Sequence, residues 1–414
     1  MGAFTKTFGN NVHSGALSNQ IPAILKDGNT VAWYDSTDLS TITKNGSDIV
    51  SRWNDKLKSG NDFVAGSCGW SDVDGMTFNG VNQYLATLAI PSLVQPESIY
   101  LAIRQVSWTT QDRIFDGSAG ASGSIYQAGV TPGLMINAGV ETYTGVVGEY
   151  LNVGAFGLIR VQFNGASGKF RINLYTQKTG NFGALNMQRI YLGEFSFAMA
   201  NYANMHIKEA IFRHAADNDV NSAIIYDYLE KKHFQTILII GDSNSQYVTA
   251  NPYPNILPIN WVGKKNPIII NKAVSGSYVT NIDNNPTTHP WMAAQVSATS
   301  GIHIDRIIVM MGTNDSVGNV PGIGDSYLAN LTQLKADHPN ALIHCMSIMP
   351  YQSGDETIRN ANNVLLQTIA EGLGCTWWDN TNWVNRATDY ADIHHINQAG
   401  HNKFTAEILS RINV

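Results

Sequence analysis

The sequence predicts two folded parts of different class. An all-β sandwich or jelly roll is expected over residues 23–234, and an α/β unit with a doubly wound, mostly parallel sheet over residues 235–414. Many short strands with alternating apolar and polar residues follow one another in the first part, which is typical of sandwiches. Strands alternate with helices in the second part, which is typical of a parallel sheet. A chain of 414 residues is also long for a single core. Residues 1–22 are expected to form an N-terminal extension.

The clearest strands of the first part form a hairpin. Ile159, Val161 and Phe163 alternate with polar residues, and the alternation resumes at Phe170 after a turn at 165–168. This pattern predicts one buried and one solvent-exposed face. Further strands are expected near residues 76–85, 98–106, 189–195 and 205–212.

A helix over residues 218–232 is expected to end the first part. Its apolar residues recur near helical spacing, at Val220, Ile224, Tyr228 and Leu229. The next strand begins at about residue 236, so the boundary falls near Phe234. Because almost no linker separates the two parts, we expect them to pack against each other.

The second part alternates between the two kinds of element. Strands are expected near residues 236–241, 267–272, 306–311, 341–347 and 375–378, and helices near 323–337, 356–372 and 398–412. In such sheets, ligand sites form just beyond the carboxyl ends of the strands. Polar residues that directly follow a strand are therefore candidates for a functional site.

The most informative motif is Gly241-Asp242-Ser243-Asn244, which directly follows the apolar run 237–240. Ser243 therefore lies where a nucleophile could be placed. A serine after a strand is usually only a helix cap, so the motif alone is weak.

Three further segments follow in order. Gly276 comes after the apolar run 268–270, and Gly312-Thr313-Asn314-Asp315 comes after the run 307–311. The segment 392–400, Asp-Ile-His-His-Ile-Asn-Gln-Ala-Gly, lies near the C-terminus. Over residues 236–414 the four segments together resemble the sequence blocks of the SGNH hydrolases, also called GDSL-type esterases. That resemblance implies a three-layer, flavodoxin-like parallel sheet and serine esterase activity.

The resemblance also implies a role for each residue. Ser243 would be the nucleophile, His395 its base and Asp392 the acid that orients the histidine. A serine hydroxyl needs such a base at neutral pH. The oxyanion hole would consist of the Ser243 and Gly276 N–H groups and the Asn314 side chain, since developing charge needs preorganised donors. No metal or organic cofactor is implied.

Two adjacent histidines compete for the role of base. The family spacing is Asp-x-x-His with a glycine five positions later, which His395 satisfies and His394 does not. The chain departs from the family at Ile396, where proline is frequent, and at Asn244, where leucine is common. The change at Asn244 bears on the pocket floor or the local packing.

Simpler interpretations of these residues are also possible. Asn314 with its neighbour Asp315 is also compatible with a strand-end turn. Asp392, His394, His395 and His401 are residue types that bind metals. Neither a His-Glu-x-x-His spacing nor a carboxylate-rich loop accompanies them, which disfavours a metal site.

The first part resembles the concanavalin-like and laminin-G-like jelly rolls. The similarity rests on Trp33-Tyr34-Asp35-Ser36 and on the segments 50–55, 78–85 and 207–211. Such modules often bind glycans or other proteins. For Trp33, Trp53 and Trp70 we favour core packing over a sugar platform, and no oxygen-rich loop is specific enough to indicate calcium.

Composition excludes several classes of function. The net charge is −6 and no cluster of Lys and Arg occurs, which argues against nucleic-acid binding. Cys68, Cys345 and Cys375 are too few for a disulfide framework. No apolar run reaches the length of a membrane span, and residues 1–6 lack a signal-peptide pattern.

The sequence therefore predicts a two-domain serine esterase that hydrolyses carboxylic esters, and O-acetyl groups on a carbohydrate are the expected substrate. Two alternatives stay open: a lipase or general carboxylesterase for small acyl esters, and a non-catalytic glycan-binding or structural protein. Low charge and many Asn and Gly residues would suit an extracellular or phage-virion-associated protein. Sandwich domains of this kind often assemble, so oligomers are possible.

Overall fold

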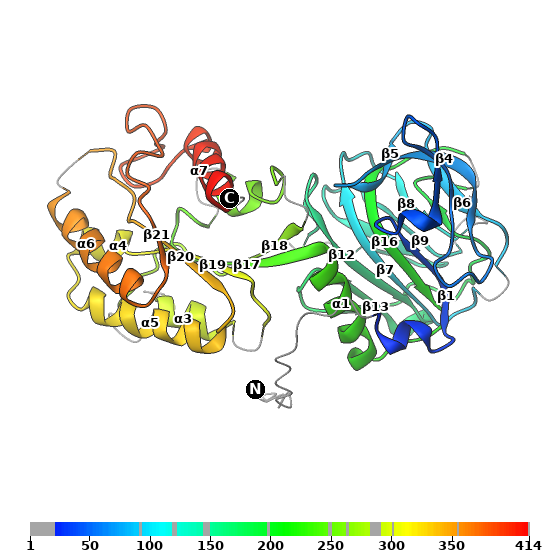
Figure 1. Cartoon of the computed structure of the whole chain (residues 1–414), viewed down its shortest axis with the longest axis horizontal. Coiled ribbons are helices and arrows are strands. Elements are labelled where there is room, and N and C mark those ends of the chain that lie inside the picture. The colour runs from blue at the N-terminus through cyan, green and yellow to red at the C-terminus, as the bar shows by residue number, and fades with distance from the viewer. Residues whose placement is uncertain are drawn as a thin grey trace.

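The computed structural model describes residues 21–90, 93–117, 122–143, 150–196, 199–246, 251–261, 265–281, 291–299, 302–353 and 356–412. Figure 1 shows two halves side by side, a β-rich half at the right and an α/β half at the left. Most of the predicted N-terminal extension, up to residue 20, lies outside the described residues.

The β-rich half is built from antiparallel pairs of short strands. Its strands are β1 (Thr30–Asp35), β2 (Ile42–Lys44), β3 (Ile49–Trp53), β4 (Phe63–Ser71), β5 (Gly75–Asn79), β6 (Tyr84–Thr87), β7 (Glu97–Gln105), β8 (Arg113–Asp116), β9 (Ser124–Gln127), β10 (Leu134–Asn137), β11 (Glu141–Tyr143), β12 (Phe156–Phe163), β13 (Gly168–Ile172), β14 (Lys178–Gly180), β15 (Tyr191–Leu192) and β16 (Asn204–Arg213). They run in the order β11-β10-β9-β8-β15-β6-β4-β5-β16-β7-β12-β13-β14, with β1 beside β16 and β3 beside β4. The predicted all-β class is confirmed for this half, whereas the concanavalin-like jelly roll stays a prediction.

Two faces of the central strands bury different cores. Ile99 and Leu101 of β7 point into the main core of the β-rich half, while Tyr100 and Ala102 belong to a second cluster on the outer face. This division follows from the two-residue period of a strand. Trp33 and Trp53 are 1% and 0% exposed and pack in these cores, as the sequence predicted.

The predicted hairpin is present as β12 and β13, but its solvent-exposed face is not. Arg160 and Gln162 of β12 are 1% and 2% exposed, so the prediction of a wet face on this strand was wrong. Helix α1 (Asp219–His233) and the segment before it cover that face, and Arg160 donates to the carbonyl oxygen of Asp217 at 2.7 Å. The alternation could not reveal that a later segment would bury the polar side.

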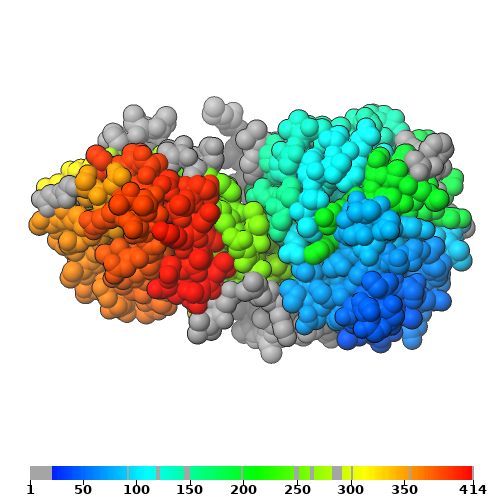
Figure 2. Space-filling model, turned by 90° about the horizontal axis from the view of Figure 1, so that it is seen from above, coloured from blue at the N-terminus to red at the C-terminus, as the bar shows by residue number. Residues whose placement is uncertain are grey.

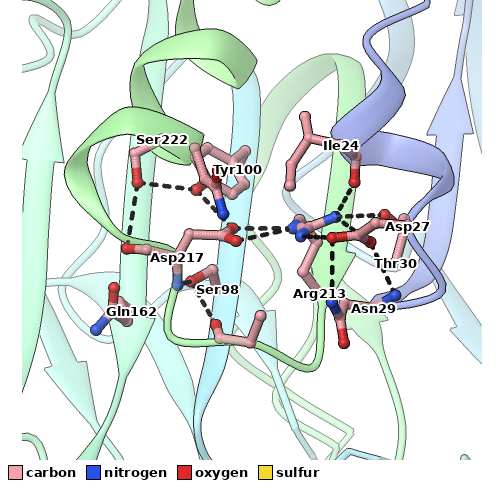
Figure 3. Close-up of polar contacts among 12 residues, drawn as sticks. Ile24, Asp27, Asn29, Thr30, Ser98, Tyr100, Gln162, Arg213, Asp217 and Ser222 are labelled. Carbon is pink, nitrogen blue, oxygen red and sulfur yellow. Dashed lines mark hydrogen bonds and ion pairs between the residues drawn. The ribbon is translucent and has the colours of Figure 1, made fainter.

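A buried charge network fastens this covering segment to the sheet (Figure 3). Arg213 has no exposed side-chain surface, and its guanidinium donates to Asp217 at 2.9 Å and to Asp27 at 2.9 Å. The hydroxyl of Tyr100 donates to Asp217 at 2.8 Å. A buried charge is tolerable only when it is paired and hydrogen-bonded in this way.

The α/β half has one five-stranded parallel sheet in the order β18-β17-β19-β20-β21. Its strands are β17 (Phe234–Gly241), β18 (Asn266–Asn271), β19 (Arg306–Met310), β20 (Leu342–Met346) and β21 (Thr376–Trp378), and its helices are α2 (Tyr253–Ile256), α3 (Met292–Ser297), α4 (Thr313–Gly318), α5 (Ile323–Asp337), α6 (Thr357–Gly372) and α7 (Gln398–Ile412). Numbered along the chain, this is the strand order 2-1-3-4-5 of flavodoxin-like folds. Helices α3, α5 and α6 cover one face and α2 and α7 the other, which confirms the predicted three layers (Figure 1).

The two halves pack directly against each other. Helix α1 ends at His233 and β17 begins at Phe234, so no linker intervenes. Ile268 of β18 packs in the same cluster as Phe156 of β12. Figure 2 shows the light-green part of the chain, which includes β18, between the halves. Of the four apolar residues that predicted α1, only Leu229 is buried. The face of the helix that packs against the sheet includes Ile225, whereas Val220 and Ile224 are exposed.

No helix among the described residues is long and apolar enough to cross a membrane. Cys68, Cys345 and Cys375 are all buried free thiols.

Candidate active site

All four sequence segments lie at the carboxyl edge of the parallel sheet. Ser243 follows β17, Gly276 follows β18, and Asn314 is the second residue of α4, which follows β19. His395 lies between β21 and α7. This edge is where open α/β sheets bind ligands, because the loops that leave neighbouring parallel strands meet there.

Ser243, His395 and Asp392 form a continuous hydrogen-bonded relay. Nε2 of His395 lies 2.9 Å from Oγ of Ser243. Nδ1 of the same ring lies 2.8 Å and 2.9 Å from the two carboxylate oxygens of Asp392. A carboxylate can only accept, so Nδ1 carries the hydrogen and Nε2 turns its lone pair toward the serine. The ring is thus in the tautomer that a general base requires.

Asp392 is held in its ionised form. Partial burial raises the pKa of this carboxyl. Hydrogen bonds from the backbone N–H of His394 and from His395 lower the pKa by more, so it lies below its ordinary value of 3.8. Both N–H groups donate to the same carboxylate oxygen at 2.9 Å. A negative charge therefore stands behind the imidazole and stabilises its protonated form.

The relay is partly open to solvent. The side chains of His395 and Asp392 are 26% and 51% exposed, and Ser243 retains 8% of its surface. The His395 and Asp392 end of the relay is therefore exposed, whereas Ser243 is buried.

The turn that presents Ser243 is tightly determined. At Gly241 a Cβ would lie 2.3 Å from Oγ of Ser245, so glycine is required there. The carbonyl oxygen of Asp242 accepts from the backbone N–H of Ser245 at 3.0 Å, and its side chain accepts from the N–H of Asn244 at 3.1 Å. Complete burial raises the pKa of Asp242.

Three hydrogen-bond donors are available beside the serine. Gly276 has a φ of 75°, a left-handed conformation that glycine adopts without strain. Among the described residues, the backbone N–H groups of Ser243 and Gly276 have no acceptor. Asn314 donates one amide hydrogen to the carbonyl oxygen of Ser277 at 2.8 Å, and an amide carries two. These three N–H groups are therefore the candidate donors for an oxyanion.

Asp315 fixes the loop that carries Gly276. Its carboxylate accepts from the backbone N–H of Val279 at 2.7 Å and from that of Thr280 at 3.1 Å. Complete burial of this side chain raises its pKa even though these hydrogen bonds lower it. The loop after β18 is therefore tied to the start of α4.

Gln295 of α3 is a supporting residue that the sequence did not reveal. Its amide accepts from the N–H of Gly241 and donates to the carbonyl oxygen of the same residue, each at 3.0 Å. It also donates to Oγ of Ser277 at 2.9 Å. One buried side chain thus joins the nucleophile turn to the oxyanion loop. A glutamine in a six-residue helix gives no recognisable sequence signal.

The other histidines lie apart from the serine. The His394 ring packs edge-on against Tyr351, with centroids 5.1 Å apart, and burial lowers its pKa. Burial lowers the pKa of His401 to about 4. Within the described part of the chain, no three His, Cys, Asp or Glu side chains are grouped to hold a metal ion. The metal alternative for Asp392 and its neighbours therefore has no support from the geometry.

Residues 239–403 match the GDSL-like Lipase/Acylhydrolase family, and this range includes all five candidate residues. This part of the chain is therefore similar to GDSL-type acylhydrolase domains.

Solved structures similar to this chain include two esterases. The aryl esterase of M. smegmatis is 16% identical over 43% of this chain and 98% of its own, with a TM-score of 0.37. A carbohydrate acetylesterase from Sinorhizobium meliloti is 14% identical over 43% of this chain and 98% of its own, with a TM-score of 0.36. Likenesses of this size do not indicate a shared substrate. No curated protein matches the chain.

Proposed function

We propose that the protein is a serine esterase that removes O-acetyl groups from a carbohydrate. The observation that carries the proposal is the relay from Ser243 through His395 to Asp392. Nε2 of His395 lies 2.9 Å from Oγ of Ser243, and Nδ1 lies 2.8 Å from a carboxylate oxygen of Asp392. Ester hydrolysis as the reaction class is also supported by the match to the acylhydrolase family over residues 239–403.

The reaction would proceed in two halves. Oγ of Ser243 attacks the ester carbonyl carbon while Nε2 of His395 takes its proton. The oxyanion accepts hydrogen bonds from the N–H groups of Ser243 and Gly276 and from Asn314. When the carbon–oxygen bond of the ester breaks, the departing alcohol takes the proton from Nε2.

The second half returns the enzyme to its starting state. A water molecule attacks the acyl-serine and gives a proton to Nε2 of His395. The tetrahedral intermediate collapses, the acid leaves, and Oγ of Ser243 regains its proton. Asp392 stabilises the imidazolium in both halves, so these side chains complete the cycle by themselves.

A carbohydrate is the favoured carrier of the ester for two reasons. The His395 and Asp392 end of the relay is exposed, so a large polymer has access to the relay from that side. A cleft of about 380 Å³ also lies between the halves, lined by Tyr150, Tyr175 and Asn152 of the β-rich half and by Asn255 of the other. It is separate from the relay, because neither Ser243 nor His395 lines it. Aromatic faces and amide groups are suited to sugar rings and hydroxyls, and binding sites are frequent at domain interfaces.

The test compares acetate release from p-nitrophenyl acetate and from acetylated xylan. We expect Ser243→Ala and His395→Ala to lose turnover on both, whereas His394→Ala, a matched neighbour, keeps it. Turnover of medium-chain esters without any release from acetylated glycans would instead favour a lipase or general carboxylesterase. Absence of turnover on every ester would overturn the esterase proposal and leave a glycan-binding protein.

A further inference from the structure

Asn244, the residue after the nucleophile, makes two hydrogen bonds to the loop that carries His395. Its amide nitrogen donates to the carbonyl oxygen of His394 at 3.0 Å. Its amide oxygen accepts from the backbone N–H of Ile396 at 3.2 Å. These two groups belong to the peptide units on either side of His395. One side chain therefore hydrogen-bonds to the backbone on both sides of the candidate base.

Two other hydrogen bonds of the backbone of His395 act differently. The Asp392 carboxylate accepts from the N–H of His395 at 2.9 Å, and the N–H of Ala391 donates to the carbonyl oxygen of His395 at 2.8 Å. Both partners belong to the loop itself, so these bonds set its shape and not its distance from Ser243. Asn244 differs because it extends from the nucleophile turn across a separation of 152 residues in the chain.

The Asn244 side chain is itself well fixed. It is 2% exposed, so water does not compete for its hydrogen bonds. Its backbone N–H donates to the buried carboxyl group of Asp242 at 3.1 Å. A leucine of similar size would fill the space but would leave the carbonyl of His394 and the N–H of Ile396 without these partners.

We propose that Asn244 is a positioning residue that keeps His395 within proton-transfer distance of Ser243; this inference rests on the proposed esterase function. A general base must lie within about 2.6–3.2 Å of the proton it removes. Because the side chain of Asn244 is buried and its amide nitrogen and oxygen both bond to the loop of His395, it affects the proton transfer and not the binding of substrate. Its loss therefore lowers kcat and leaves KM unchanged.

The experiment measures kcat and KM on p-nitrophenyl acetate together with hydrogen exchange of the Ile396 amide by NMR. Asn244→Leu is the main variant, and Asn244→Asp keeps the acceptor for Ile396 while it removes the donor to His394. Asn79→Leu is the matched control, since the Asn79 side chain also accepts from backbone N–H groups but lies in the β-rich half.

We expect Asn244→Leu to lower kcat on the order of 10-fold to 100-fold, the scale for displacing a catalytic group by up to about 1 Å, with KM within about twofold. The Ile396 amide should exchange faster in this variant and keep most of its protection in Asn244→Asp. The control should change neither quantity.

The inference is wrong if kcat of Asn244→Leu stays within about threefold of the parent. If the Ile396 amide then also exchanges faster, the contact stabilises the loop but does not position His395 for catalysis. If the parent hydrolyses no ester, the proposed function fails and the positioning role fails with it. In that case the Ile396 exchange still shows whether the contact itself exists, so the two failures are distinguishable.

Discussion

Glu97 should make the stability of the β-rich half fall as the pH rises. This residue begins β7 and is 1% exposed, and neither oxygen of its carboxyl group has a hydrogen-bond partner among the described residues. Burial raises its pKa from the ordinary value of 4.5 to about 8. At neutral pH the side chain is therefore a neutral acid in the folded protein and a carboxylate in the unfolded chain.

The sign and size of the effect follow from proton linkage. The folded-state pKa is raised, so the stability contribution is fully present below pH 4.5 and is lost as the pH rises toward 8. Each pH unit in this window costs about 1.4 kcal/mol of unfolding free energy. Replacing the acid by an amide, in Glu97→Gln, removes this dependence. The unfolding free energy of the variant relative to that of the parent should therefore rise by about 3 kcal/mol between pH 4.5 and pH 7.

Urea unfolding at pH 5, 6, 7 and 8, followed by circular dichroism and tryptophan fluorescence, measures this difference. The gap between Glu97→Gln and the parent should widen with pH and level off above pH 8. Turnover of p-nitrophenyl acetate serves as the control and should be unchanged, because Glu97 lies in the other half of the chain. A gap that is the same at every pH would refute the reasoning.

Three further predictions concern the candidate active site. Gln295→Leu leaves the N–H of Gly241 without its partner, while the carbonyl oxygen of Gly241 still accepts from the N–H of Val274, so urea unfolding should show a loss of about 2 kcal/mol. Asp392→Asn should lower kcat by on the order of 10⁴, because the tautomer of His395 is no longer fixed; kcat within tenfold of the parent would contradict this. Gly276→Ala meets no crowding but strains the left-handed backbone, so we expect a stability loss of about 1 kcal/mol. Its kcat on p-nitrophenyl acetate should fall by on the order of 10² as the N–H shifts, and an unchanged kcat would exclude that donor.

Much of the α/β half could be predicted because its signals are local. Predicted helices at 323–337 and 398–412 coincide with α5 and α7, and all five strands lie within two residues of their predicted bounds. Short apolar runs bounded by glycine or polar residues indicate such elements without knowledge of the rest of the fold. The candidate residues were predicted from the resemblance to the SGNH blocks. Ser243, Gly276 and Asn314 each follow a strand closely, whereas Asp392 and His395 are marked by the Asp-x-x-His spacing before α7.

The features that escaped prediction depend on residues far apart in the chain. Arg160 and Gln162 looked solvent-exposed because nothing in their own strand shows that α1 will cover them. The run at 76–85 was predicted as one strand but forms β5 and β6, because Gly80, at a φ of 69°, turns the chain between them. Asn244 likewise looked like a local departure from the family pattern. Its role is visible only when the loop that carries His395 is in place.

The account as a whole depends on Ser243 being a nucleophile that His395 activates. The most direct measurement is labelling with a fluorophosphonate, followed by mass spectrometry of the modified peptide. We predict one adduct, on Ser243, which His395→Ala slows strongly and His394→Ala does not. An unlabelled Ser243 in a protein that still hydrolyses esters, or an adduct on another residue, would contradict the account.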